Sequence, residues 1–415
     1  MSKIKGLIIG NVLKLFLGNS GAQVITFLAA LVLARLYSPE QFGILGVFLA
    51  ISQILIPISC LGYEAAIVIT NDIVDAYKVC FICFIINLIF SIILYIPIFV
   101  FDEAICHLLN TKEIYPWIYL LPICVFLGGC FNALNYFNTK LKCYSDIAKS
   151  NVVKSFSCAV IQMSGAIIKA GAGSLILGQV FMNLFGNIKL ATNLIRSGNF
   201  SYLNTGLVNL VKKYKKFPLF YSWGVLFNTI SFNITNILIK KVFTSSDVGY
   251  YSYSYKYIGF PISMISTAIG QVYFQELSDA KYKNPSSVFL STLVKLLLIG
   301  LPIFICLYFV IEPVFVIAFG ERWRIAGELG KIMIPLFLIR FIVSPLSITL
   351  IVFEKQKFLL FWQIGLVVFT VLPYIMSMYN DYNIYQYIYS MTLFIGLYYV
   401  LYFFIIYYVI RQNNG

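Results

Sequence analysis

Long apolar segments separated by short polar ones dominate the hydrophobic pattern of this chain. A helix that spans a membrane needs roughly 20 consecutive, mostly apolar residues. The strands of an outer-membrane barrel would instead alternate apolar and polar positions, and these runs do not. The pattern therefore predicts twelve membrane-spanning helices, at 12–34, 42–63, 79–101, 116–138, 150–170, 173–193, 217–239, 251–273, 289–316, 331–353, 357–379 and 384–410.

The composition supports this interpretation. Of the 415 residues, 60% are apolar and only 11% are charged, whereas soluble domains have about 45–50% apolar and about 25% charged residues. So few charges cannot form the polar surface of a cytosolic enzyme, a nucleic-acid-binding domain or a disordered chain. The predicted fold class is an all-α polytopic membrane protein.

The net charge of +14 orients the chain in the membrane. Of thirty basic residues, eighteen fall on the side that holds both termini and eight on the opposite side. Because cytoplasmic loops carry the excess of Lys and Arg, we expect both termini to be cytoplasmic. The first apolar run is too long for a signal peptide, so we expect it to be the first span. No nucleic-acid partner is expected.

A polar segment at 194–216 lies near the midpoint and contains Lys212, Lys213, Lys215 and Lys216. Basic residues at a membrane surface attract anionic lipid by about 1 kcal/mol each, so membrane lipid is an expected partner. The segment predicts an N-terminal six-helix lobe at 1–200, a cytoplasmic basic linker at 201–216 and a C-terminal six-helix lobe at 217–415.

The two halves share a short motif. At a constant offset of 206 residues, a basic residue that ends one helix precedes a polar turn, an apolar residue and a glycine. The matching pairs are Arg35 with Lys241, Ser38 with Thr244, Phe42 with Val248 and Gly43 with Gly249. Six spans per half give both halves the same orientation, so we expect a parallel repeat of two lobes around a central cavity.

Signatures of common catalytic sites are absent from the sequence. The chain has no G-x-x-x-x-G-K-[ST] phosphate loop and no H-E-x-x-H motif, and its one histidine, His107, has no partner histidine. Cys80 and Cys83 have a C-x-x-C spacing but lie in an apolar helix with no second pair, so a structural role is favoured. We expect no catalytic residues, no metal, no cofactor and no enzymatic activity.

Polar residues at membrane depth are the candidate binding residues. A charge near the bilayer centre costs at least ~2.5–3.5 kcal/mol, so such residues normally face an interior or a water-filled cavity. The candidates are Lys14, Gln23, Arg35, Gln53, Asn228, Asn233, Lys256, Lys295 and Arg340. The four charges within spans are all cationic, which favours an anionic substrate. Two alternatives stay open: the lysines snorkel to the headgroups, and the asparagines only join neighbouring helices.

Three motifs carry a resemblance to a known family: A-R-x-x-x-P-E-x-F-G at 34–43, D-V-G-Y-Y-S at 247–252, and Phe319-Gly320 followed by Ala326. With twelve spans in two lobes, the whole chain resembles the polysaccharide-transporter branch of the multidrug/oligosaccharidyl-lipid/polysaccharide exporter superfamily. Within that branch it is most similar to O-antigen flippases of the Wzx type.

The resemblance implies a flippase that moves an undecaprenyl-pyrophosphate-linked oligosaccharide repeat unit from the cytoplasmic to the periplasmic leaflet by alternating access. It implies that the in-span cations contact pyrophosphate and the amides contact sugar hydroxyls, with other membrane proteins of polysaccharide assembly as further partners. Two alternatives are a drug or metabolite exporter of the same superfamily and a membrane-embedded polysaccharide polymerase or ligase.

Overall fold

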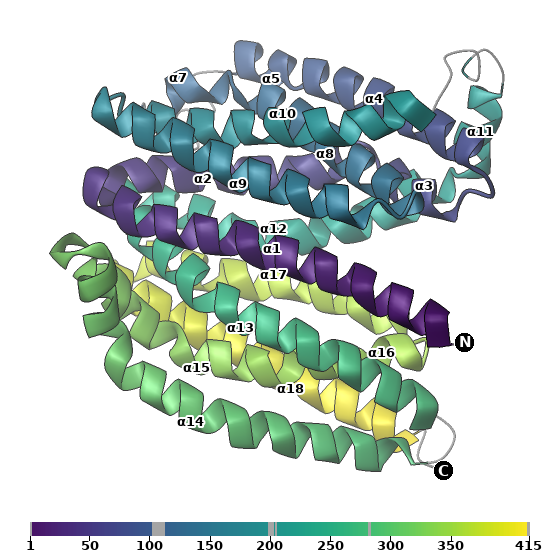
Figure 1. The fold of residues 1–415 in the computed structure, drawn as a ribbon. Coiled ribbons are helices and arrows are strands. Elements are labelled where there is room, and N and C mark those ends of the chain that lie inside the picture. Colours follow the sequence, from purple (N-terminus) through teal and green to yellow (C-terminus); the bar gives the residue numbers. More distant parts are fainter. Residues whose placement is uncertain (1, 102–112, 198–202, 204–205, 281–283, 413–415) are drawn as a thin grey trace. The chain divides into compact units, whose positions relative to one another are not determined.

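The computed structural model describes residues 2–101, 113–197, 203, 206–280 and 284–412 (Figure 1). Within these ranges every regular element is a helix. Each of the twelve predicted spans overlaps one long helix, although several of the helices end or begin up to eight residues inside the predicted range. The long helices are α1 (Ser2–Leu36), α2 (Pro39–Leu55), α4 (Ile73–Ile93), α8 (Leu121–Lys140), α9 (Tyr144–Ile167), α10 (Ala172–Ser197), α12 (Ser222–Val242), α13 (Ser245–Ala280), α14 (Pro285–Phe319), α15 (Arg324–Leu346), α17 (Gln356–Tyr379) and α18 (Ile384–Gln412).

Shorter helical elements continue or connect the long ones. They are η1 (Ile56–Ile58), α3 (Tyr63–Ile69), α5 (Tyr95–Val100), α7 (Tyr115–Ile118), α11 (Leu207–Lys213), the π-helical turn η3 (Phe217–Tyr221), η4 (Glu321–Trp323) and α16 (Thr349–Val352).

Nine helical segments of the described ranges are long and apolar enough to cross a membrane. The other three long helices, α9, α12 and α13, carry more polar side chains and fall outside these nine. The described chain is thus an all-α, multi-pass membrane protein, as its hydrophobic pattern predicts.

The chain forms two compact units, Met1–Thr229 and Ile230–Gly415, which we call the N-terminal unit and the C-terminal unit. Their boundary lies within α12, whereas the sequence predicts a linker at 201–216. That segment contains α11, which packs against α4 and buries Leu210 and Tyr214 in a core formed with α3, α4 and α8. The predicted lobe limits themselves stay a prediction.

Small residues allow close helix packing in the N-terminal unit, where α9 packs against both α1 and α10. A Cβ atom on Gly18 of α1 would lie 2.2 Å from the Ala148 Cβ, and one on Gly165 of α9 would lie 2.0 Å from the Ser174 Cβ. Backbones that approach this closely gain van der Waals contact, which drives helix association where lipid removes the hydrophobic effect.

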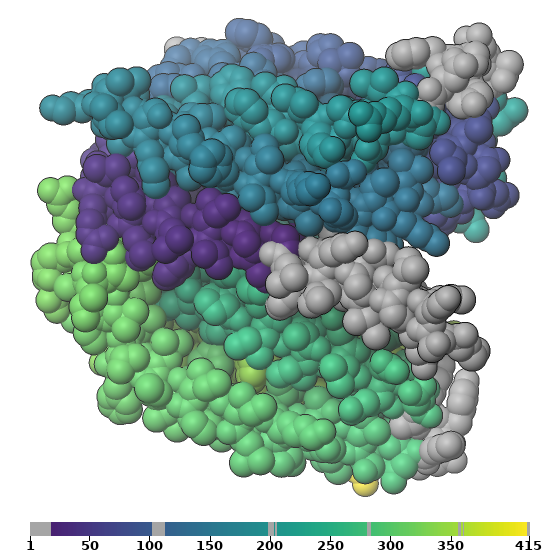
Figure 2. Space-filling model, in the orientation of Figure 1, coloured from purple at the N-terminus to yellow at the C-terminus, as the bar shows by residue number. Residues whose placement is uncertain are grey.

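In the C-terminal unit α15 packs against α13, α14 and α18. α17 packs against α18 through stacked rings: the Trp362 ring centroid lies 4.1 Å from that of Tyr398 and 3.9 Å from that of Tyr402. α14 lies at the surface of this unit (Figure 2), where Leu298, Phe309 and Ile317 are more than two-thirds exposed. Apolar surface of this extent fits contact with lipid.

The repeated turn has the same capping geometry in both halves. Before α2, the Gln41 N–H donates to Ser38 Oγ (3.3 Å) and the Ser38 N–H donates to Gln41 Oε1 (3.0 Å). Before α13, the Asp247 N–H donates to Thr244 Oγ1 (3.2 Å) and the Thr244 N–H donates to Asp247 Oδ2 (3.0 Å). Both turns are capping boxes, at positions that the offset of 206 residues relates.

Candidate functional site

Arg340 is the predicted candidate that the structure surrounds most fully. It lies on α15, inside the apolar segment Glu321–Val352. Its Cζ lies 5.1 Å from the ring centroid of Phe232 and 5.6 Å from those of Tyr255 and Tyr399. Its Nη1 donates a hydrogen bond to the Tyr255 hydroxyl. Rings from α12, α13 and α18 thus form a cage around the guanidinium of α15.

The cage stabilises the charge without neutralising it. A cation over an aromatic face gains up to about 2 kcal/mol when it is desolvated, but the ring takes no proton and supplies no negative charge. The ion pairs within the described C-terminal unit join Arg324 to Glu312 and Glu321, and none includes Arg340. Phe232 is 39% exposed, so one wall of the cage is accessible. An anion could therefore bind the guanidinium.

The other candidates of the C-terminal unit lie apart from this cage. Lys256 on α13 is exposed, and its ammonium lies 5.4 Å from the Tyr257 ring centroid. Lys295 on α14 is exposed and lines a pocket between α13 and α14. Asn233 is half-buried on α12, next to Phe232 in sequence. Asn228 is half-buried on the same helix but belongs to the N-terminal unit.

The candidates of the N-terminal unit lie at several separate places. Gln23 is half-buried on α1, next to the interface where Asn151 Nδ2 of α9 donates to Asn19 Oδ1 (2.7 Å). Gln53 is exposed on α2. Arg35 is exposed and donates to the Leu31 carbonyl (2.7 Å) in the last turn of α1, as expected for a cation at a helix C-terminus.

Two residues discussed in the sequence analysis, Lys14 and His107, have side chains that the structure does not describe. Lys14 lies within α1, before the apolar segment Gly18–Leu36, and its side chain is outside the described set. His107 lies outside the described residues.

Lys154 is not among the predicted candidates, because it is one of the eighteen basic residues assigned to the cytoplasmic side. The structure places it on α9, and its ammonium lies 3.4 Å from the centroid of the Phe131 ring on α8. Gly186 of α10 makes room for this side chain, since a Cβ there would lie 2.6 Å from Lys154 Cγ. Its position within the predicted span at 150–170 was the available signal.

Glu64 is the second missed residue. Its position just beyond the predicted span at 42–63 is typical of a solvated loop residue. The structure instead places it in the first turn of the short helix α3, where it is 5% exposed and has an Oε2 atom without a hydrogen-bond partner among the described residues. Cys83 of α4 and Tyr221 of η3 are its titratable neighbours. Burial raises the pKa of this carboxyl to about 7, although backbone hydrogen bonds from Glu64 and Gly62 act to lower it.

The cysteines have the predicted structural setting. Cys60, Cys80 and Cys83 are fully buried in the core around α3, α4 and α8, and all described cysteines are free. Within the described ranges, no group of three or more His, Cys, Asp and Glu side chains is arranged to hold a metal ion.

Comparison with known proteins identifies relatives along most of the chain. A family model described as polysaccharide biosynthesis protein matches residues 32–327. The succinoglycan biosynthesis transport protein ExoT of Rhizobium meliloti is 26% identical over 357 residues, which cover 83% of this chain and 69% of ExoT. The lipopolysaccharide biosynthesis protein WzxC of Escherichia coli is 22% identical over 325 residues, which cover 76% of this chain and 64% of WzxC.

Solved structures share the fold at low sequence identity. An inward-facing multidrug resistance MATE family transporter of the MOP superfamily has a TM-score of 0.76 at 14% identity, covering 94% of this chain and 95% of that one. The lipid II flippase MurJ in an inward closed conformation has a TM-score of 0.71 at 11% identity, covering 93% and 86%. The chain belongs to the polysaccharide biosynthesis protein family and has the fold of these transporters.

Proposed function

We propose that this protein is a flippase for a lipid-linked oligosaccharide, the repeat unit of a surface polysaccharide joined through pyrophosphate to undecaprenol. It moves the unit from the cytoplasmic to the periplasmic leaflet of the bacterial inner membrane by alternating access. Its termini are cytoplasmic, and other membrane proteins of polysaccharide assembly are its partners. The names of the relatives, a succinoglycan biosynthesis transport protein and a lipopolysaccharide biosynthesis protein, support a polysaccharide precursor as the substrate.

The single observation that carries the proposal is the aromatic cage of Arg340. A guanidinium has five N–H donors, and Tyr255 accepts from one of its terminal nitrogens. The remaining donors match a phosphate, which Arg binds in a bidentate manner. Arg340 lies in an apolar helical segment and has no carboxylate partner among the residues that the structure describes, so its charge is suited to the pyrophosphate that joins sugar to lipid.

The membrane potential favours the proposed direction. Moving one elementary negative charge from the inside to the outside of an inside-negative membrane gains about 2.3 kcal/mol per 100 mV. In this proposal Lys14, Lys256 and Arg35 contribute further positive charge along the route. Gln23, Gln53, Asn228 and Asn233 contact sugar hydroxyls, which amide groups bind by both donating and accepting.

The experiment that tests the proposal follows the lipid-linked unit in cells that depend on this protein. Arg340→Ala is expected to slow appearance of the unit in the outer leaflet by roughly 10- to 100-fold, the value of one lost charged hydrogen bond. The unit should then accumulate in the inner leaflet. Arg340→Lys is expected to restore part of the activity, since it keeps the charge but not the planar donors.

Arg324→Ala is the matched control. Arg324 lies on the same helix but is exposed and paired with Glu312 and Glu321, so its loss is expected to leave flipping nearly unchanged. Immunoblots establish equal protein levels. Normal surface polysaccharide with Arg340→Ala would contradict the role of the cage. In a strain that lacks the protein, accumulation of single units in the outer leaflet would instead indicate a polymerase, and intact glycan with altered drug tolerance would indicate a drug exporter.

A further inference from the structure

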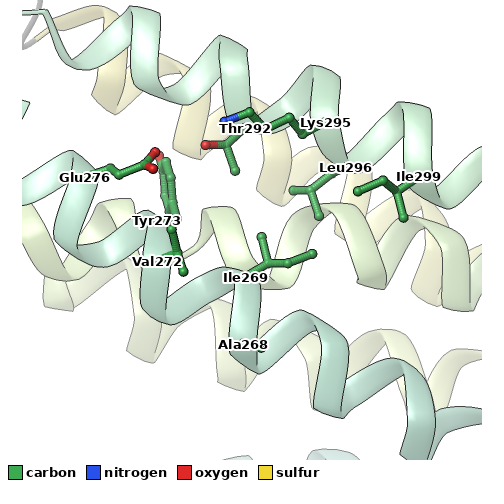
Figure 3. A pocket seen from close by; sticks show the side chains of 9 residues that line it. All are labelled: Ala268, Ile269, Val272, Tyr273, Glu276, Thr292, Lys295, Leu296 and Ile299. Atoms are coloured by element: carbon green, nitrogen blue, oxygen red, sulfur yellow. The ribbon is translucent and has the colours of Figure 1, made fainter. Parts of the chain in front are cut away.

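A pocket of about 330 Å³ lies between α13 and α14 of the C-terminal unit (Figure 3). Its volume is at the lower end of the range for ligand sites, about 300–1,000 Å³. It shares no residue with the cage of Arg340. The lining side chains are Ala268, Ile269, Val272, Tyr273, Glu276, Thr292, Lys295, Leu296 and Ile299.

The pocket has a polar end and an apolar end. In Figure 3 the Lys295 side chain extends along α14 toward Thr292, and the Glu276 carboxylate points toward the same end from α13. Leu296, Ile299 and Ile269 line the other end. The sequence creates this polarity because the two helices run in opposite directions: Glu276 is near the end of α13, and Thr292 is near the start of α14.

Helix lengths place the polar end at the membrane surface. α13 has 36 residues and α14 has 35, so each is roughly 50 Å long and exceeds the ~30 Å hydrocarbon core by about 10 Å at each end. Lys295 is ten residues into α14, roughly 15 Å from its start. The charged end therefore lies near the boundary between headgroups and hydrocarbon, and the apolar end lies deeper.

The two charges of the pocket are free to bind a ligand. Lys295 and Glu276 are both exposed, and neither has an ion pair or a hydrogen bond with another described residue. Opposite charges at the surface end of an apolar pocket complement a lipid whose headgroup also has both charges. An ammonium group can donate hydrogen bonds to the Glu276 carboxylate while the phosphate accepts from Lys295.

We propose that this pocket binds a phospholipid with a phosphoethanolamine headgroup, with the phosphate on Lys295, the primary ammonium on Glu276 and an acyl chain against Ile269, Leu296 and Ile299. Glu276 excludes lipids whose headgroup has only negative charge, because two anions in contact repel. This exclusion also covers the pyrophosphate-linked substrate of the proposed function. A quaternary choline has no N–H to donate, so it loses the hydrogen bond that the ethanolamine makes.

Native mass spectrometry of the purified full-length protein tests this proposal. The protein is first exchanged into vesicles that contain equal parts of phosphatidylethanolamine, phosphatidylcholine and phosphatidylglycerol. The protein is expected to retain phosphatidylethanolamine in preference to the other two. Glu276→Gln and Lys295→Met should each lower its retention by about tenfold, the value of a lost charged hydrogen bond. Exchanging both charges, Glu276→Lys with Lys295→Glu, should recover part of it.

Asp279→Asn and Lys331→Met are matched controls, since these residues belong to the same unit but do not line the pocket. They should retain the lipid as the native protein does, and size-exclusion chromatography identifies any variant that misfolds. Ala268→Phe, which fills the apolar end, should also release the lipid. Equal retention of all three lipids, preference for phosphatidylglycerol, or unchanged retention in both single variants would overturn the proposal. This readout is independent of flipping, so its failure leaves the proposed function standing.

Discussion

Glu64 is a buried carboxyl group that makes stability depend on pH. Burial raises its pKa from 4.5 to about 7, so the folded chain binds this proton more tightly than the unfolded chain does. The resulting stabilisation is fully present below about pH 4.5 and is lost as the pH rises through about 7. Above that value the ionised group lowers the free energy of unfolding by about 3 kcal/mol relative to acidic solution.

Glu64→Gln is expected to remove this dependence. At about pH 8 the variant should be more stable than the native chain by about 1–3 kcal/mol, whereas at about pH 5 the difference should be smaller. Thermal unfolding of the purified protein in detergent at both pH values measures this. Glu40→Gln, at an exposed carboxylate of the same unit, is the control and should show little pH dependence. An equal effect of Glu64→Gln at both pH values would contradict the assignment.

The charge of Arg340 and its position deep in a predicted span make it a candidate binding residue from the sequence alone. They do not predict which side chains surround it. Phe232, Tyr255 and Tyr399 come from three helices that are distant in the chain, and no local pattern marks rings that converge in space. Glu64 and Lys154 were missed for another reason. Both lie within a turn or two of a predicted span boundary, where the sequence does not distinguish a solvated charge from a buried one.

At the scale of helices, Gly186 determines how closely α10 packs around Lys154. A Cβ at this position would lie 2.6 Å from Lys154 Cγ and 3.0 Å from the Phe131 ring. We expect Gly186→Ala to lower the free energy of unfolding by about 1–3 kcal/mol, the usual cost of overpacking. Gly224 on α12 has open space where its Cβ would be, so Gly224→Ala should be neutral or stabilising by up to about 1 kcal/mol.

Thermal unfolding of the two alanine variants under identical conditions compares the sites. Because both substitutions add the same single methyl group to a helix, only the local packing differs between them. A similar midpoint for the two variants would show that α10 can move away from Lys154 without cost.

The two capping boxes predict equal roles for the turns before α2 and α13. Ser38→Ala and Thr244→Ala each remove the hydroxyl that accepts an N–H of the first helical turn, and each should cost about 1 kcal/mol. Hydrogen exchange is the measurement, with faster exchange confined to the first turn of the affected helix. Ser38→Thr, which keeps the hydroxyl, serves as control. Protection unchanged by Ser38→Ala would mean that helix packing alone holds the turn.

Helices were easier to predict than their ends. A long helix lies at each of the twelve predicted spans, and nine helical segments of the described ranges are apolar and long enough to cross a bilayer. The helix ends were not predicted: α13 extends from Ser245 to Ala280, beyond the predicted 251–273 at both ends. Helix propensity allows a helix to continue beyond its apolar segment, whereas the hydrophobic pattern predicts only the apolar segment itself.

For the whole molecule, the positions of the basic residues predict the topology. Lys154 must now be left out of the cytoplasmic count, because its ammonium lies over the ring of Phe131. The excess of basic residues on the side of the two termini is still large enough to apply the positive-inside rule, which depends mainly on short loops. We therefore expect both termini to be cytoplasmic, the turn at Asp381 between α17 and α18 to face outward, and Lys355 before α17 to face the cytoplasm.

Cysteine labelling in intact cells tests this topology. Asp381→Cys should react with a maleimide that cannot cross the membrane, whereas Lys355→Cys should react only after the membrane is opened. Cys306 is exposed and the other described cysteines are buried or half-buried, whereas Cys106 lies outside the described residues. Cys106→Ser combined with Cys306→Ser therefore provides the background for both variants. Labelling of Lys355→Cys alone in intact cells would reverse the orientation. The proposed direction of transport would still stand, because an inside-negative potential drives an anion outward whichever way the protein is inserted in the membrane.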